Sequence, residues 1–494
     1  MLFSSYEFIL GFLPAALLAF HYCRIRFGGR TALIVVALAS FFFYGWWNPP
    51  YLILLTGSML ANYIFARRLS EVPSTRLLQV AVLLNLCVLG YFKYRNFFLE
   101  NISALVGESM DLGAVFVPLA ISFFTFQQIA LLIDANDGRA KIADWVDFTA
   151  FVALFPQLIA GPIVLFREIE DQFAKLKNRE GLGLSMFGPG LAIFSLGLFK
   201  KIVLADSIAP YVDAGYRAVE TLTFLEAWAV AIAYSLQLYF DFCGYSDMAV
   251  GLALMLGIVL PINFNTPFRA ASMVDFWKRW HITMTRFFMM YLYSPIALAL
   301  TRRSVENEYG ALKAFAVAIA LPIGITFLLS GLWHGAAWTF VAFGAVNAVG
   351  LIANHAWREA KMPSLPWPAG WILTMLTVVI SFVYFRAGDM TEAHTILSAM
   401  FSPQNIVLPN WLAGLATQFD IPWRTLDFFA SGSYTVRLTG WIALLLLLSL
   451  LPQNPAANPS GIRPSFVTAC LTAGMLLISL GLLDRPQAFI YFQF

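Results

Sequence analysis

Apolar runs long enough to cross a bilayer recur along the whole chain. Of its 494 residues, 60% are hydrophobic and 12% are charged, compared with about 45–50% and about 25% in a typical soluble domain. Backbone groups in lipid must be hydrogen-bonded within their own segment, and these runs are continuous rather than alternating, so helices are favoured over a barrel. We therefore predict an all-α polytopic membrane protein with about 10–14 transmembrane or re-entrant helices around a central tunnel.

Several of the runs are short or interrupted by proline. A broken helix at membrane depth is tolerated only where protein or a water-filled cavity receives the freed backbone groups. The pattern therefore predicts some re-entrant segments and a buried cavity in the middle of the chain. The candidate spans lie near residues 6–22, 31–48, 50–66, 78–92, 114–133, 147–164, 187–205, 224–240, 246–260, 284–300, 314–330, 335–353, 370–385, 437–451 and 465–483.

Three segments do not have the composition of a span, and no separate soluble domain or repeat is visible in residues 1–494. Residues 165–182 predict an interfacial amphipathic helix, because their apolar side chains recur at helical spacing. Residues 401–436 predict an extramembrane loop with room for one short helix, and residues 452–464 predict a linker. We expect one integral-membrane domain. The apolar positions of the amphipathic segment are Phe166, Ile169, Phe173 and Leu176.

The charge pattern indicates an orientation but no nucleic-acid partner. The net charge is only +3, which gives no electrostatic case for binding nucleic acid. Arg24, Arg26 and Arg30 follow the first apolar run closely, so the positive-inside rule places that loop in the cytoplasm and the N-terminus outside. The four cysteines are scattered without a CxxC pair, so no metal site is predicted.

Two of the five histidines lie in unusual surroundings. His334 follows a long apolar stretch in the segment Ser-Gly-Leu-Trp-His-Gly (330–335), and His281 ends the run Phe-Trp-Lys-Arg-Trp-His (276–281). An ionisable group at membrane depth is costly and marks a functional site by default. Neutral histidine can act as a general base, although hydrogen bonding to a neighbouring helix explains His334 equally well. The other histidines, His21, His355 and His394, are most simply interfacial.

The cationic run before His281 has two interpretations. Trp277, Lys278, Arg279 and Trp280 match a juxtamembrane belt, with basic and aromatic side chains at the lipid headgroups. Alternatively, the two cations attract an anionic donor while His281 reaches the reaction path.

Two further clusters interrupt apolar sequence. The segment 237–247 contains Asp241, Tyr245, Ser246 and Asp247, which suit either a polar turn between spans or a polar wall that orients a hydroxylated acceptor or a histidine. In Phe-Pro-Gln-Leu-Ile-Ala-Gly-Pro (155–162), Gln157 is the one polar side chain of a broken helix. A structural kink and a pore-lining position both fit it.

Together these motifs resemble the membrane-bound O-acyltransferase family, most closely its bacterial alginate O-acetyltransferase branch. The resemblance rests on residues 155–162, 238–249, 275–281 and 331–336, which occur in the family's order. Shorter similarities extend it over essentially the whole chain, in Gly-Tyr-Phe-Lys-Tyr (90–94), Ile-Ser-Phe-Phe-Thr-Phe-Gln (121–127), Tyr-Phe-Arg-Ala (384–387) and Tyr-Phe-Gln-Phe (491–494).

The resemblance implies a multi-pass enzyme of a bacterial inner membrane. Such an enzyme moves an acetyl group from a cytosolic thioester, acetyl-CoA or an acyl-carrier thioester, toward an exported polysaccharide of alginate-like or cellulose-like type. It implies no bound cofactor or metal, and it implies periplasmic acetyltransferase or polysaccharide-modifying partners alongside membrane lipids. His334 matches the family's presumed catalytic base and His281 its second essential histidine. Trp277, Lys278, Arg279, Trp280, Trp333, Asp241, Tyr245, Ser246, Asp247 and Gln157 are the expected donor or substrate path.

One stretch departs from that branch. After the first histidine the branch continues with an Arg-Asp pair and later a Gly-Gly pair, whereas residues 288–300 here are Phe-Met-Met-Tyr-Leu-Tyr-Ser-Pro-Ile-Ala-Leu-Ala-Leu. Two charges and a flexible turn are thus replaced by apolar residues, which leaves the acceptor open.

Two other classes of function compete with acyl transfer. An exporter of acyl groups or lipid-linked sugars would also need broken helices and intramembrane polar residues, but no inverted repeat is visible. A non-catalytic scaffold of a secretion complex is the third possibility.

Overall fold

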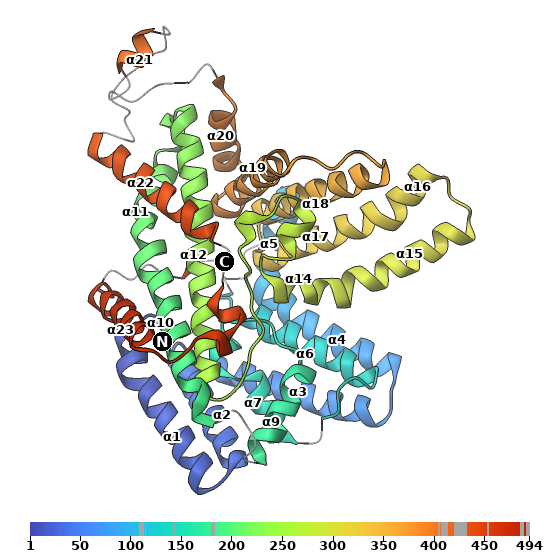
Figure 1. Ribbon diagram of the computed structural model, residues 1–494. Coiled ribbons are helices and arrows are strands. Elements are labelled where there is room, and N and C mark those ends of the chain that lie inside the picture. The colour runs from blue at the N-terminus through green and yellow to red at the C-terminus, as the bar shows by residue number, and fades with distance from the viewer. Residues whose placement is uncertain are drawn as a thin grey trace. The chain divides into compact units, whose positions relative to one another are not determined.

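The computed structural model is helical, and in the residues that it describes it contains no strand (Figure 1). Those residues are 1–107, 113, 115–142, 144–178, 183–403, 406, 413–418, 432–451, 454–484 and 489–490. The all-α class is confirmed. The chain divides into two compact units, described separately below, and one membrane domain over 1–494 stays a prediction. Unit 1 comprises Met1–Phe199, Cys243–Asn263 and Pro455–Pro486, and unit 2 comprises Lys200–Phe242, Phe264–Asn454 and Gln487–Phe494.

Unit 1 consists of the N-terminal helices and one helix from near the C-terminus. Helix α6 packs against both α3 and α4, α2 packs against α7 and α9, and α23 lies along α10. Its helices are α1 (Leu13–Arg26), α2 (Gly29–Gly45), α3 (Tyr51–Glu71), α4 (Thr75–Leu89), α5 (Arg95–Val106), α6 (Ile121–Asn136), α7 (Trp145–Val152), α8 (Phe155–Leu158), α9 (Phe166–Lys177), α10 (Phe187–Phe199) and α23 (Phe466–Gly481).

Unit 2 is built around α17, α18 and α19, which pack side by side (Figure 1). The long helix α12 (Phe224–Met255) contributes its first part to unit 2 and its last part to unit 1. The other helices of unit 2 are α11 (Asp206–Arg217), α13 (Met273–Trp277), α14 (Ile282–Phe288), α15 (Ser294–Glu306), α16 (Ala311–Phe315), α17 (Leu321–His334), α18 (Trp338–Glu359), α19 (Trp367–Arg386), α20 (Met390–Met400), α21 (Ala413–Gln418) and α22 (Gly432–Ser449).

Five helices in the described part of the chain are long and apolar enough to cross a membrane. Together with the family assignment given below, they make the protein a multi-pass membrane protein. The total number of crossings and the central tunnel stay predictions. The five spans are Glu7–Arg26, Thr75–Val106, Ala311–His334, Trp338–Glu359 and Trp367–Arg386.

Several of the long helices contain a π-helical turn. Such turns widen the helix locally and are frequent at functional sites. Two of them matter for the sites described below, η4 (Lys200–Ala205) between α10 and α11, and η7 (Met289–Tyr293) between α14 and α15.

Three of the predicted spans are wrong in detail. The runs 224–240 and 246–260 are not separate, because α12 continues through the polar residues between them. The interpretation of 237–247 as a turn is therefore wrong. The run 147–164 forms only the short helices α7 and α8 followed by extended backbone. Pro156 and Pro162 limit helix growth there, since proline lacks an N–H to donate.

The segments predicted to lie outside the bilayer are partly described. Helix α9 forms within 165–182, and its four predicted apolar side chains are buried inside unit 1, while its place at the membrane surface stays a prediction. Most of 401–436 lies outside the described residues, apart from α21 and the start of α22. Residues 454–464 form two 3₁₀ turns. The motif 491–494 also lies outside the described residues.

Candidate active site

His281 occupies a strained and buried position. It directly precedes α14, where its backbone lies in the left-handed region with φ 42° and ψ 53°, and its side chain is 0% exposed. A residue with a Cβ pays about 1–2 kcal/mol for this conformation. Strain of this kind persists only where surrounding structure enforces it, and it clusters at functional sites.

His334 ends α17, and two glycines bring the next helix close to it. A Cβ at Gly331 would overlap the backbone carbonyl of Phe340, and a Cβ at Gly335 would overlap the Phe340 ring. Glycine therefore lets α18 approach α17 closely at this end. His334 is 6% exposed.

The two histidines lie together in unit 2. Their ring centroids are 6.4 Å apart, and Trp333 lies next to both, at 6.0 Å from His281 and 4.9 Å from His334. The edge of Phe242 meets His281 at 4.7 Å, and Phe385 meets His334 at 5.1 Å. Two imidazoles in an aromatic shell can exchange protons with a substrate while water is kept away.

The tryptophans of the cationic run face the protein interior. Trp277 is 4% exposed and Trp280 is 2% exposed, and the Trp280 ring stacks on Phe276 at 5.6 Å. A belt at the lipid headgroups would leave these rings on the surface. The belt interpretation is therefore wrong for the tryptophans.

The two cations of this run differ in their surroundings. The Arg279 side chain donates through Nε to Asp275 at 2.8 Å, whereas Lys278 is exposed. Of the two cations, Lys278 is therefore the more exposed to solvent.

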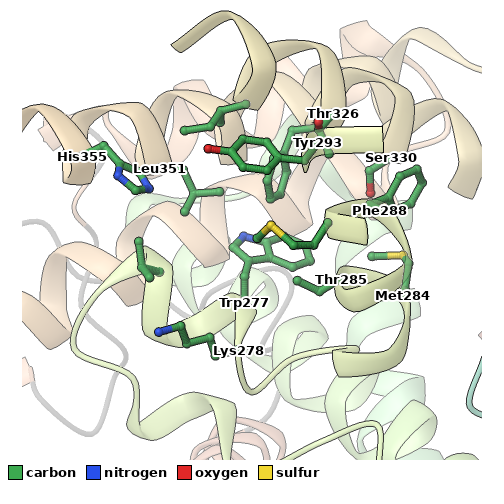
Figure 2. A pocket seen from close by; sticks show the side chains of 14 residues that line it. Trp277, Lys278, Met284, Thr285, Phe288, Tyr293, Thr326, Ser330, Leu351 and His355 are labelled. Atoms are coloured by element: carbon green, nitrogen blue, oxygen red, sulfur yellow. The ribbon is translucent and has the colours of Figure 1, made fainter. Parts of the chain in front are cut away.

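An apolar cavity of about 220 Å³ lies within unit 2 (Figure 2). Neither His281 nor His334 is among the described residues that line it, but the ring of Phe288 in its wall lies 6.5 Å from the ring of Trp333, the neighbour of both histidines. Trp277 and Thr326 line the cavity, and their buried Nε1 and Oγ1 atoms have no hydrogen-bond partner among the residues that the structure describes. Ser330 also lines it, one turn before His334 on α17, and Lys278 and His355 belong to its wall. A buried polar atom without a partner is costly, so a ligand that supplies hydrogen bonds would fit here.

Much of this wall could not be singled out from the sequence. Thr326 and Ser330 look like ordinary small polar residues of an apolar helix, and His355 looked interfacial. The stretch that departs from the alginate branch also contributes, through Phe288, Met289 and Tyr293.

Asp241 lies in the unit 2 part of α12, paired with a lysine that the sequence did not single out. The Lys201 Nζ atom is 2.6 Å from Asp241 Oδ1 and 2.7 Å from Asp206 Oδ1. Lys201 follows Lys200 inside an apolar run. A charged residue within such a run is rare, and this is the one sequence feature that could have drawn attention to Lys201.

The other predicted path residues belong to unit 1. The Tyr245 ring stacks on Phe3 at 4.8 Å, and Ser246 and Asp247 are buried. Gln157 is buried as well and donates through Nε2 to the Phe151 carbonyl at 2.6 Å, as a structural kink requires. Whether these residues take part in the site stays a prediction.

No metal centre is visible in the described parts of both units, where His, Cys, Asp and Glu side chains form no group of three or more that could hold an ion.

The fold and the site define a polytopic helical membrane protein whose unit 2 contains a buried pair of histidines and an apolar cavity. The chain belongs to the membrane-bound O-acyltransferase family, whose sequence profile matches residues 69–390. This range contains both histidines and the cavity wall, and the protein is accordingly an O-acyltransferase.

Several bacterial proteins named as acyl-transferring enzymes are similar to the chain. The chain is 33% identical to a peptidoglycan O-acetyltransferase of Helicobacter pylori, over 100% of this chain and 98% of that protein. It is 36% identical to a probable alginate O-acetylase of Azotobacter vinelandii, over 88% of this chain and 85% of that protein. A teichoic acid D-alanyltransferase of Streptococcus thermophilus is 29% identical over 54% of this chain and 68% of its own length.

Proposed function

We propose that this O-acyltransferase moves an acetyl group from a cytosolic thioester to an exported cell-envelope polysaccharide of a bacterium, from a site in the inner membrane. The observation that carries the proposal is the pair of buried imidazoles 6.4 Å apart. The relatives named for O-acetylation support acetyl as the group transferred. Hand-over to a periplasmic partner and direct acylation of the polymer are two forms of the same proposal.

His334 acts as the general base. An acceptor hydroxyl attacks the thioester carbonyl, so that a C–O bond forms and the C–S bond breaks. The hydroxyl proton passes to the His334 imidazole and then to the departing thiolate, which leaves as a thiol. His281, held in one conformation by its backbone, orients the thioester or stabilises the charge that develops on its oxygen.

The cavity of unit 2 binds the donor arm, which is the extended part of the donor molecule that ends in the thioester. Lys278 is exposed at its wall and suits the anionic end of a thioester donor such as acetyl-CoA. Trp277 Nε1 and Thr326 Oγ1 offer hydrogen bonds to amides along the arm. Since Ser330 lies one turn from His334, an arm in the cavity would approach the base with its thioester end.

Substitution of His334 tests this function. His334→Ala should lower the acetyl content of the secreted polymer by about 10²–10⁴-fold, the usual worth of a general base, with the amount of protein in the membrane unchanged. His394→Ala on α20 is the matched control and should acetylate normally. Wild-type acetylation by His334→Ala at equal expression would sink the assignment.

A labelled donor separates the enzyme from an exporter. Purified protein incubated with labelled acetyl-CoA, and with the polymer or the purified partner added, should place label on protein or acceptor. An exporter would label neither. Replacing acetyl-CoA by an acetylated carrier protein identifies the donor.

A further inference from the structure

A buried charge cluster in unit 2 is not used by the reaction steps above. Lys201 on η4 bridges Asp206 and Asp241 at 2.7 and 2.6 Å, and the three side chains are 2%, 7% and 1% exposed. Burying charges is expensive unless each is paired. The cluster therefore fixes the Asp241 carboxylate in one position, with its second oxygen directed elsewhere.

The second oxygen of Asp241 holds the described C-terminal segment. Its Oδ2 atom accepts a hydrogen bond from the backbone N–H of Ile490 at 3.0 Å. The neighbouring Phe489 ring lies 6.1 Å from Phe242, and both Phe489 and Ile490 are buried. A segment far along the chain is thus attached to α12 by one charge-assisted hydrogen bond and one ring contact.

The same place on α12 supports His281. Phe242 follows Asp241 directly, and its ring edge meets the His281 imidazole at 4.7 Å, nearly perpendicular at 88°. Phe264 packs against Phe242 at 4.9 Å, and Phe489 lies 6.1 Å from it. The Phe242 ring is fully buried, so these contacts restrict its movement.

We propose that Asp241 is a positioning residue. It fastens the C-terminal segment at Phe489 and Ile490 against Phe242, and the Phe242 ring in turn shields the His281 imidazole. The proposal rests on the proposed function only in giving His281 a part in acyl transfer. Lys201, which Asp206 holds in place, contacts Oδ1 of Asp241 and leaves Oδ2 to accept from the Ile490 N–H. Asp241 touches no substrate in this scheme.

Ile490→Pro tests the hydrogen bond without changing Asp241. Proline has no N–H to donate, whereas the control Ile490→Val keeps the N–H and a similar shape. For Ile490→Pro we expect kcat of acetyl transfer to fall about 10- to 100-fold, the scale of a small misplacement, with KM for the donor unchanged. The melting temperature in detergent should match that of Ile490→Val.

A second measurement shows directly how accessible the His281 imidazole is. Diethyl pyrocarbonate modifies accessible imidazoles, and mass spectrometry shows which of the five histidines has reacted. His281 should be protected in the wild type and in Ile490→Val, and should react faster in Ile490→Pro. If Ile490→Pro does not fold, Phe489→Leu, which removes the ring next to Phe242, answers the same question.

The reactivity of His281 decides the proposal. Unchanged protection in a folded Ile490→Pro overturns it, whatever happens to kcat. Faster reaction together with a lower kcat supports it. Faster reaction with an unchanged kcat supports the attachment through Asp241 but shows that His281 takes no part in acyl transfer. That outcome contradicts the role of His281 in the proposed function and not the attachment.

Discussion

At the scale of single residues, His281 is fully buried with a left-handed backbone, and His334 is buried at the end of α17. His281 and His334 stood out because an ionisable group is rare in an apolar chain. The left-handed backbone of His281 could not be predicted from the sequence, because histidine, although enriched there among non-glycine residues, adopts that conformation only rarely. Thr326 was equally hidden, since a threonine in an apolar helix most often bonds back to its own helix.

The unpartnered polar atoms of the cavity give the prediction at this scale. Thr326→Val removes the Oγ1 atom at nearly constant shape, and Trp277→Phe removes the Nε1–H. Each should raise KM for the thioester donor by roughly 2–12-fold, the worth of about 0.5–1.5 kcal/mol for one neutral hydrogen bond, with kcat nearly unchanged.

Steady-state kinetics with varied donor checks this expectation. Thr377→Val on α19 is the matched control, because the Thr377 hydroxyl bonds back to the Leu373 carbonyl at 2.9 Å and does not line the cavity. A KM for Thr326→Val equal to that of the control would remove Thr326 from the donor path.

At the scale of elements, several of the predicted apolar runs coincide with single helices. The runs 335–353, 370–385 and 465–483 correspond to α18, α19 and α23. The run pattern failed at α12, because the polar residues in its middle find buried partners that sequence alone does not reveal. Lys201, which pairs with Asp241, is such a partner.

Packing of α17 on α18 gives the prediction for this scale. A Cβ at Gly331 would overlap the Phe340 carbonyl, whereas a Cβ at Gly324 on the same helix meets nothing within 4 Å. Gly331→Ala should therefore destabilise the protein by about 1–3 kcal/mol, as overpacking does. It should also lower activity, because His334 is one turn further along α17.

Melting curves in detergent measure that difference. Gly324→Ala should melt no lower than the wild type, since alanine favours a helix over glycine by about 0.8–1.0 kcal/mol in peptides. Equal melting temperatures for the two variants would contradict the close helix contact.

For the whole molecule, the charges at the ends of the spans of unit 2 indicate an orientation. Arg302, Arg303 and Lys313 flank the connection from α15 to α16, and Arg358 and Lys361 flank the connection from α18 to α19. Because α17 and α18 pack as neighbours with reversed direction, these basic ends lie together (Figure 1). The positive-inside rule then places them in the cytoplasm, the side from which a thioester donor arrives.

This orientation predicts which side of the membrane each end of α19 faces. Lys361→Cys, before α19, should react with a membrane-impermeant maleimide only after the inner membrane is opened. Gly388→Cys, after α19, should react in intact spheroplasts, because α19 is long and apolar enough to cross. Both variants need a background without the native cysteines, since Cys87 and Cys470 are exposed. Labelling of Lys361→Cys from outside would reverse the orientation, and the donor cavity with its exposed Lys278 would then have to be filled from the periplasm, where acetyl-CoA is not made.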